Sequence, residues 1–186
     1  MEFQERTPNR IPEYDYSLND AYFVTICTQD RKRILSKIVG DGSPVPQTCG
    51  KIAEAMILQI PNKYPSVSVE NYVIMPDHIH LLLRFDRDLG TGNPSPTVKD
   101  CGTGKPSPTI KDCGTGNPSP TLGNVVGCYK YQVTKQINSL TNTQGVKVFQ
   151  RSYYDHVIRN QQDYNEIWEY IQYNPKKWVI QKRGFE

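Results

Sequence analysis

The sequence predicts an α+β protein whose strands form one antiparallel sheet. Short runs of β-branched and aromatic residues alternate along the chain with segments whose apolar residues recur at the helical period. The length of 186 residues and the hydrophobic content of 37% are sufficient for one core. We therefore expect a single domain over residues 1–186, interrupted by one long insertion.

Four segments are expected to form strands. Residues 21–28 (AYFVTICT) are β-branched and aromatic, which suits a central strand. Residues 67–75 and 78–85 enclose the turn signal Pro76-Asp77, so we expect these two segments to form a hairpin. A fourth strand is expected within residues 147–158, around Val148, Phe149, Val157 and Ile158.

Two helices are expected between these strands. Residues 51–60 and 125–140 carry apolar side chains at helical spacing, and Pro61 is expected to end the first helix. The side chains expected to be buried are Ile52, Ala55, Met56 and Ile60 in the first helix, and Val126, Tyr129, Val133 and Ile137 in the second.

A last helix is expected near the end of the chain. Asp163 and Glu166 resemble a capping box at its start, and Pro175 is expected to end it. The resulting order is that of a ferredoxin-like split βαβ antiparallel sheet, with helices on one face and an added C-terminal helix. The expected buried stripe of this last helix is Tyr164, Ile167, Trp168 and Ile171.

Residues 89–123 differ in composition from the rest of the chain. A unit of 12 residues begins at Gly90, recurs at Gly102 and starts again at Gly114. Each unit holds two Gly, two Pro and one sizeable aliphatic residue, so it has too little apolar surface to offset the entropy of ordering. We expect this segment to be a flexible loop, and residues 40–50 to be a second loop.

Composition restricts the location of the protein and its partners. The net charge of +3 is mildly basic, which is compatible with a nucleic-acid partner if the positive charge is clustered. No apolar run approaches the roughly 20 residues of a membrane span, and the five cysteines form no close CxxC pair. We expect a cytoplasmic protein with reduced thiols and no membrane contact.

The segment Asp77-His78-Ile79-His80 is the sharpest local feature. Residues two apart on a strand share a face, so His78 and His80 should project together while Ile79 faces a core. Two such imidazoles can share a metal ion if a third ligand arrives from elsewhere. The pattern is equally compatible with two strand histidines in a polar network, because an isolated His-x-His is a weak signal.

The last helix carries a second feature. Tyr170 is expected at the edge of the apolar stripe, with Asn174 one turn later on the same face. A hydroxyl nucleophile and an amide oxygen ligand would then lie side by side. The alternative is that Tyr170 only packs at the helix edge, as most such tyrosines do.

Four blocks of sequence together resemble a known family. They are YFVTICT from Tyr22, MPDHIHLLL from Met75, RSYYDHVIR from Arg151 and YIQYNP from Tyr170. In this order they resemble the single-tyrosine HUH transposases, and most closely their REP-associated tyrosine transposase branch, which is IS200-like. The resemblance spans residues 22–175.

The resemblance implies a metal-dependent single-stranded DNA endonuclease and strand transferase. It implies that His78, His80 and Asn174 hold a divalent ion and that Tyr170 attacks the phosphorus. The implied product is a covalent 5′-phosphotyrosine with a free 3′-hydroxyl, formed reversibly at hairpin-associated sites. Imidazole mixed with oxygen ligands suits Mg²⁺ or Mn²⁺ better than a closed zinc site.

Basic residues are the candidates for contact with single-stranded or hairpin DNA. His156 is a candidate phosphate donor or proton shuttle, and equally a structural strand histidine. A catalytically inactive nucleic-acid-binding or regulatory module remains the alternative function. The sequence also leaves open whether the helix carrying Tyr170 completes its own site or that of a partner in a homodimer. The candidate DNA-binding residues are Arg31, Arg33, Lys130, Arg151, His156, Arg159, Lys176 and Lys177.

Overall fold

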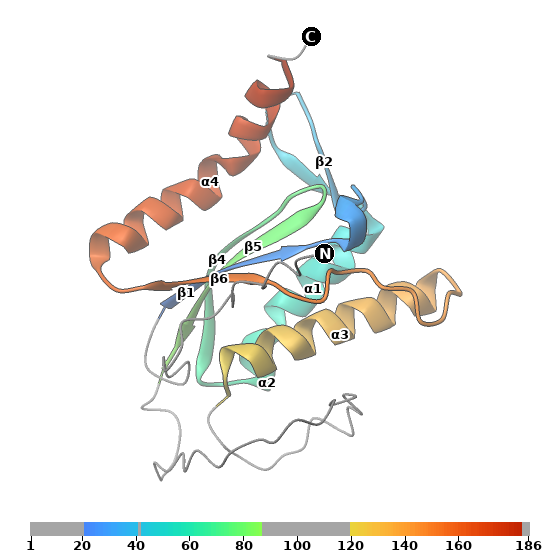
Figure 1. The fold of residues 1–186 in the computed structure, drawn as a ribbon, viewed down its shortest axis with the longest axis horizontal. Helices are drawn as coiled ribbons and strands as arrows, with labels where there is room; N and C mark the ends of the chain where they lie inside the picture. Colours follow the sequence, from blue (N-terminus) through green and yellow to red (C-terminus); the bar gives the residue numbers. More distant parts are fainter. Residues whose placement is uncertain (1–20, 41, 87–119, 184–186) are drawn as a thin grey trace, which may run out of the picture.

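The fold is an antiparallel sheet with helices on both faces (Figure 1). The computed structural model describes residues 21–40, 42–86 and 120–183. Most of the predicted loop at 89–123 lies outside these residues. Among the described residues, no helix is both long and apolar enough to span a membrane.

Four strands form the main sheet in the order β4-β5-β1-β6, and every neighbouring pair is antiparallel. This is the strand order of a split βαβ sheet, so the predicted α+β class is confirmed. The strands are β1 (Ala21–Cys27), β4 (Val67–Ile74), β5 (His78–Phe85) and β6 (Tyr154–Ile158).

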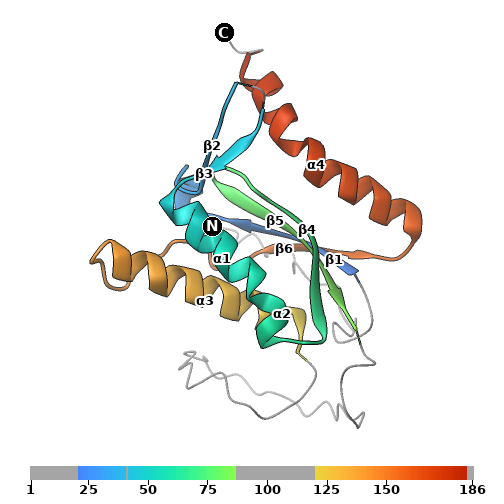
Figure 2. The same ribbon diagram turned by 180° about the vertical axis from the view of Figure 1, so that it is seen from behind.

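Two long helices cover one face of the sheet, as Figure 2 shows from behind. They are α1 (Thr48–Leu58) and α3 (Leu122–Leu140), and α2 (Ile60–Lys63) follows α1 directly. Their apolar side chains pack against the strand residues that face away from the two histidines. This core includes Tyr22, Val24, Ile26, Ile79, Leu81, Leu83, Ile57, Val126, Tyr129, Val133 and Ile137.

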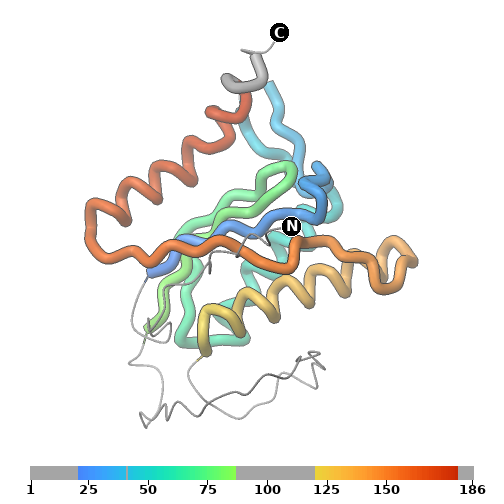
Figure 3. The backbone as a smooth tube through the Cα atoms, in the orientation of Figure 1, coloured from blue at the N-terminus to red at the C-terminus, as the bar shows by residue number. Residues whose placement is uncertain are grey.

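The last helix, α4 (Gln161–Arg183), packs on the opposite face of the sheet. The tube in Figure 3 follows the chain from β6 through a tight connection into α4. A smaller core joins α4 to the sheet around Ile171, which is 1% exposed. Its other buried members are Ala21, Val73, Met75, Leu82 and Ile158.

The segment predicted as a loop at 40–50 contains regular structure. β2 (Ser36–Ile38) and β3 (Pro44–Pro46) pair as a small antiparallel hairpin. At its tip, the backbone of Gly42 has φ +89°, and a Cβ there would lie 3.2 Å from Cγ of Lys176. A glycine is therefore required where the hairpin approaches α4.

The first helix differs from its prediction at both ends. It begins at Thr48 rather than residue 51 and ends at Leu58, while Pro61 lies in the first turn of α2 instead of stopping a helix. Ala55 is exposed, and the buried stripe instead includes Ala53 and Ile57. The apolar period of this short segment is compatible with two faces, and packing against α3 selects one.

The fourth strand is shorter than predicted. Val148 and Phe149 are buried but lie outside β6, and Phe149 forms only an isolated bridge with Thr28. Gln150 donates its backbone N–H to the carbonyl of Cys27 at 2.9 Å, but residues 150–153 have no register partner on β1. Burial of these two apolar side chains therefore reflects the core rather than a strand.

The last helix begins earlier and ends later than predicted. Asn160 caps it, because its side-chain oxygen accepts a hydrogen bond from the backbone N–H of Asp163 at 2.8 Å. The helix also continues through Pro175, which is buried. Trp168 is 36% exposed, although its ring stacks on Tyr164. Packing on both sides of Pro175 overrides the helix-breaking tendency of proline.

Candidate functional site

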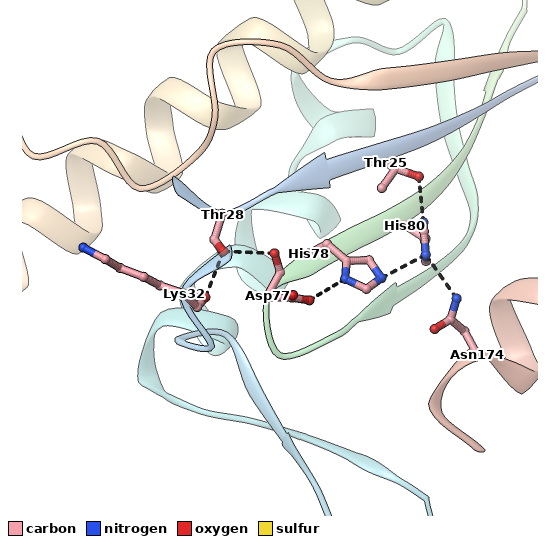
Figure 4. Close-up of polar contacts among 7 residues, drawn as sticks. All are labelled: Thr25, Thr28, Lys32, Asp77, His78, His80 and Asn174. Atoms are coloured by element: carbon pink, nitrogen blue, oxygen red, sulfur yellow. Dashed lines mark hydrogen bonds and ion pairs between the residues drawn. The ribbon is translucent and has the colours of Figure 1, made fainter. Parts of the chain in front are cut away.

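The two histidines lie side by side on β5, as predicted from their spacing. His78 is 8% exposed and His80 is 4% exposed. Their Nε2 atoms are 3.1 Å apart (Figure 4). The intervening Ile79 points into the opposite core. The two Nε2 atoms thus approach a common point on the face that α4 covers.

Each imidazole is held through its other ring nitrogen (Figure 4). Oδ1 of Asp77 lies 2.6 Å from Nδ1 of His78, and Oγ1 of Thr25 lies 2.8 Å from Nδ1 of His80. An ionised carboxylate only accepts, so Nδ1 of His78 donates to it and Nε2 of the neutral ring keeps a lone pair. A threonine hydroxyl can also accept, which allows the same tautomer in His80.

Both histidines are neutral at neutral pH. Burial lowers the pKa of His78, although the hydrogen bond and charge of Asp77 act in the opposite direction. Burial, with smaller contributions from the charges of His78 and Arg31, lowers the pKa of His80 to about 3. Neutral imidazoles are the form that binds metal ions.

The backbone of Asp77 is fixed by the end of β1. The buried Thr28 donates its backbone N–H to the carbonyl of Asp77 at 2.9 Å, and its hydroxyl lies 2.9 Å from the same oxygen. The backbone N–H of Met75 donates to the carbonyl of His78 at 2.9 Å and closes the turn. The carboxylate therefore meets the imidazole from a rigid turn.

Asn174 brings a third polar group from α4. Its side chain is 9% exposed, and its Nδ2 lies 3.2 Å from Nε2 of His80. The oxygen and nitrogen of a side-chain amide are exchanged by a half-turn, which would place Oδ1 at this position. Ile171 anchors the preceding turn in the core, and Gln172 reaches Oδ1 of Asn71 at 3.4 Å.

The donor set fits one divalent ion. Two nitrogens 3.1 Å apart can both lie about 2.1 Å from one ion at an angle of about 95°, close to the octahedral value. Within the described residues, no group of three His, Cys, Asp or Glu side chains could hold a metal. A metal ion bound here would therefore need the side-chain amide of Asn174 as its third protein ligand. This is the ligand set that the family resemblance implies.

Tyr170 lies beside the histidine pair. Its ring contacts the rings of His80 and Phe23 edge-on, with centroids 5.4 and 5.8 Å away. The side chain is 39% exposed, and Nζ of Lys177 lies 5.5 Å from its ring centroid. α4 thus brings Tyr170 and Asn174 to the same histidine, as expected from their spacing of one turn.

The other tyrosines of α4 have different surroundings. The hydroxyl of Tyr164 donates to Oε2 of Glu70 at 3.0 Å, near the far end of the helix. Tyr173 is 52% exposed, and Nζ of Lys176 lies 5.6 Å from its ring centroid. Tyr170 is thus the tyrosine of α4 whose ring touches His80.

Several predicted basic residues surround this site. The guanidinium of Arg33 lies 5.7 Å from the ring centroid of Trp178, whose ring is 6.0 Å from that of His78. The charge of Arg31 lowers the pKa of both histidines. Arg151 and Arg159 are exposed beside β6, and Lys176 and Lys177 are exposed on α4.

Two predicted DNA-binding residues are engaged elsewhere. Nζ of Lys130 lies 2.7, 2.9 and 3.4 Å from the backbone carbonyls of residues 150, 151 and 152, and burial lowers its pKa. Its donors hold the segment before β6. Nε2 of His156 lies 2.9 Å from Oδ2 of Asp163, which ties β6 to the start of α4. These contacts favour structural roles for both residues.

Three neighbours of the site were not found from the sequence. Asp77 was assigned only to a turn, although its place before His78 is a signal for a carboxylate–histidine contact. Thr25 depends on strand register, which the sequence does not reveal. Phe23 stacks on His80 with centroids 5.1 Å apart, a contact that also depends on strand register.

No protein-family model matches the chain. A Haemophilus influenzae protein described as uncharacterized is 30% identical over 169 residues, which cover 91% of this chain and 87% of that protein. The chain belongs to the same family as that protein.

A solved structure of a REP-associated tyrosine transposase bound to a REP hairpin is also similar to this chain. It has a TM-score of 0.51 and 17% identity, over 90% of this chain and 74% of the other. The similarity shows that this chain has the fold of that transposase, in agreement with the resemblance identified in the sequence.

Proposed function

We propose that this chain is a metal-dependent nicking and joining enzyme for single-stranded DNA, with transposase-like chemistry. The observation that supports it best is the meeting of Tyr170 and Asn174 at His80. The ring of Tyr170 lies 5.4 Å from that of His80, and Nδ2 of Asn174 lies 3.2 Å from its Nε2. A metal-sensing module would need His78 and His80 but would not require a half-exposed tyrosine at this place.

His78, His80 and Asn174 are the residues that would hold Mg²⁺ or Mn²⁺. When bound, such an ion neutralises charge that builds on the phosphate oxygens during attack. Asp77 and Thr25 orient the two imidazoles so that their Nε2 atoms point to a common place, where they would be available to such an ion.

Tyr170 is the nucleophile in this proposal. Its phenol oxygen forms a bond to phosphorus and releases its proton to solvent, while the bond from phosphorus to the 3′-oxygen breaks. The departing oxygen takes up a proton and becomes a free 3′-hydroxyl. The phosphodiester energy is kept in the 5′-phosphotyrosine, so attack by another 3′-hydroxyl can rejoin DNA without a nucleotide cofactor.

The exposed cations near the site would bind the DNA backbone. Arg33 and Lys177 each lie against an aromatic ring next to the histidine pair. Fold similarity to a transposase bound to a REP hairpin supports a hairpin-associated target for this chain as well. α4 completes the site within one chain, so the proposal does not require a homodimer.

The experiment is a nicking assay on labelled single-stranded DNA that contains a hairpin followed by an unpaired segment. Tyr170→Phe should abolish Mn²⁺-dependent cleavage, and His80→Ala should do the same. Tyr173→Phe is the matched control, because it removes the same hydroxyl from a more exposed position on the same helix. Cleavage by Tyr170→Phe at the wild-type rate would contradict the proposal.

A further inference from the structure

α4 covers only part of the face that carries the histidines. It leaves the end of β6 and runs back past the β4–β5 hairpin (Figure 1). Its polar contacts with the sheet reach Glu70 and Asn71 on β4, His80 on β5 and, at the start of the helix, His156 on β6. Ala21 and Ile158, at one end of the β1–β6 half, are buried in the core that α4 shares with the sheet, whereas Tyr154 at the other end of this half is exposed.

Tyr154 lies on this half and is level with His80 across the sheet. Thr25 is the register partner of both His80 on β5 and Tyr154 on β6. Directly opposed residues of antiparallel strands share a face. Two strand spacings put the backbone of Tyr154 about 10 Å from that of His80.

The ring of Tyr154 is available to a ligand. The side chain is 57% exposed, the highest value among the exposed tyrosines of the described chain. Within the described residues it has no side-chain hydrogen bond or ring contact. Single exposed aromatic residues are common on protein surfaces, so exposure alone does not indicate a binding site. The evidence for one is the position of Tyr154 relative to the other aromatic residues.

That position is next to a series of aromatic rings. Phe23 lies on the same face of β1, two residues before Thr25. Its ring stacks on that of His80 with centroids 5.1 Å apart and meets the ring of Tyr170 edge-on with centroids 5.8 Å apart. The aromatic side chains thus extend from the β6 edge to the proposed nucleophile. Bases of any sequence stack on such rings, because every base has a π-face.

The charges around this face also suit a polyanion. Nζ of Lys177 and the guanidinium of Arg33 lie beside rings at the site. Two nearby carboxylates, those of Asp77 and Asp163, are each hydrogen-bonded to a histidine. A second copy of the chain is a poorer occupant, since a two-fold interface would bring like cations together.

We propose that the Tyr154 end of the β1–β6 half of the histidine face is a stacking surface for single-stranded DNA, on which Tyr154 holds a base close to the reacting phosphate. This inference rests on the proposed function and names the residue that holds the unpaired strand. The aromatic ring of Tyr154 stacks on the base, and its hydroxyl is not needed for binding.

The test measures affinity for a fluorescein-labelled single-stranded oligonucleotide of about 20 nucleotides in EDTA, where metal-dependent cleavage is blocked. Tyr154→Thr keeps a β-branched residue in the edge strand but removes the ring, and it should raise Kd about 5- to 150-fold. Tyr154→Phe should bind like wild type. Tyr131→Thr is the control, because Tyr131 is 41% exposed on α3, on the other side of the sheet.

The salt dependence separates stacking from charge. Tyr154→Thr removes no phosphate contact, so the slope of log Kd against log salt should stay at the wild-type value. Equal affinities for all variants, or an equal loss in Tyr154→Phe and Tyr154→Thr, would overturn the inference. Loss of a dimer by Tyr154→Thr with unchanged DNA affinity would assign the face to a second copy instead.

The proposed function can fail separately. If Tyr154→Thr weakens DNA binding but no covalent adduct forms on Tyr170, the proposed stacking surface is supported and the proposed enzymatic function is wrong. If the adduct forms and Tyr154→Thr binds normally, the enzyme stands and the stacking surface is wrong.

Discussion

Replacing Asp77 with Asn should weaken divalent-ion binding without disturbing the fold. The carboxylate of Asp77 lies 2.6 Å from Nδ1 of His78, and the two side chains are only 12% and 10% exposed. The substitution keeps the shape of the side chain and removes its charge. It also introduces an NH₂ group that can hold the wrong histidine tautomer, in which Nε2 carries the proton.

The magnitude follows from this contact. Loss of the partner that orients a metal-binding histidine typically costs 10- to 100-fold in affinity, or about 1.4–2.7 kcal/mol. The fold should be kept, because Thr28 binds the backbone carbonyl of Asp77, which the substitution does not alter. Thr25→Val should act in the same direction on His80.

The assay is calorimetric titration of the metal-free protein with Mn²⁺. Asp30→Asn is the matched control, because it makes the same chemical change at an exposed residue near the site. Asp30 has φ 55°, a conformation that Asn tolerates well. Wild-type Mn²⁺ affinity in Asp77→Asn, or an equal loss in Asp30→Asn, would refute the reasoning.

Three further predictions concern stability and measure unfolding. Lys130→Met should lower the free energy of unfolding by about 1–2 kcal/mol, because it removes the donor to three carbonyls, and it should leave the affinity for single-stranded DNA unchanged. Deleting residues 90–113, two of the 12-residue units, should shift Tm by no more than a few degrees, and a large loss would show that the units pack. Burial acts to raise the pKa of Glu70, but hydrogen bonds from Ser68 and Tyr164 and the charge of Arg84 lower it overall. A carboxylate whose pKa is lowered on folding contributes stability that is complete above its ordinary pKa and is lost as pH falls through its folded-state pKa. Glu70→Gln should therefore destabilise by less than ~1 kcal/mol at pH 7, and its denaturation curves should converge with those of wild type in acid, below the folded-state pKa of Glu70.

The sequence predicts best where one periodic pattern decides the structure. The bounds of β5 and the buried stripe of α3 are confirmed, because alternating or helically spaced apolar residues leave a single arrangement that buries them. The shared face of His78 and His80 follows from the same rule. The one-turn spacing of Tyr170 and Asn174 likewise predicts that they share a face of the helix, and in the structure both lie beside His80, in the site to which the family resemblance assigned them.

The sequence predicts poorly where tertiary packing opposes a local rule. Proline normally stops a helix, yet α4 continues through Pro175 because Ile171 before it and Trp178 after it both pack on the second core. The β2–β3 hairpin has three-residue strands, too short for a periodic signal. The contact between Thr25 and His80 depends on strand register, which only the folded sheet defines.

Mapping the covalent adduct tests the central claim most directly. The protein is incubated with labelled single-stranded hairpin DNA and Mn²⁺, resolved on a denaturing gel, digested and analysed by mass spectrometry. The account predicts one DNA-linked peptide, with the phosphate on Tyr170 and none in Tyr170→Phe. An adduct on Tyr173 or Tyr154, or cleavage with no adduct at all, would contradict it.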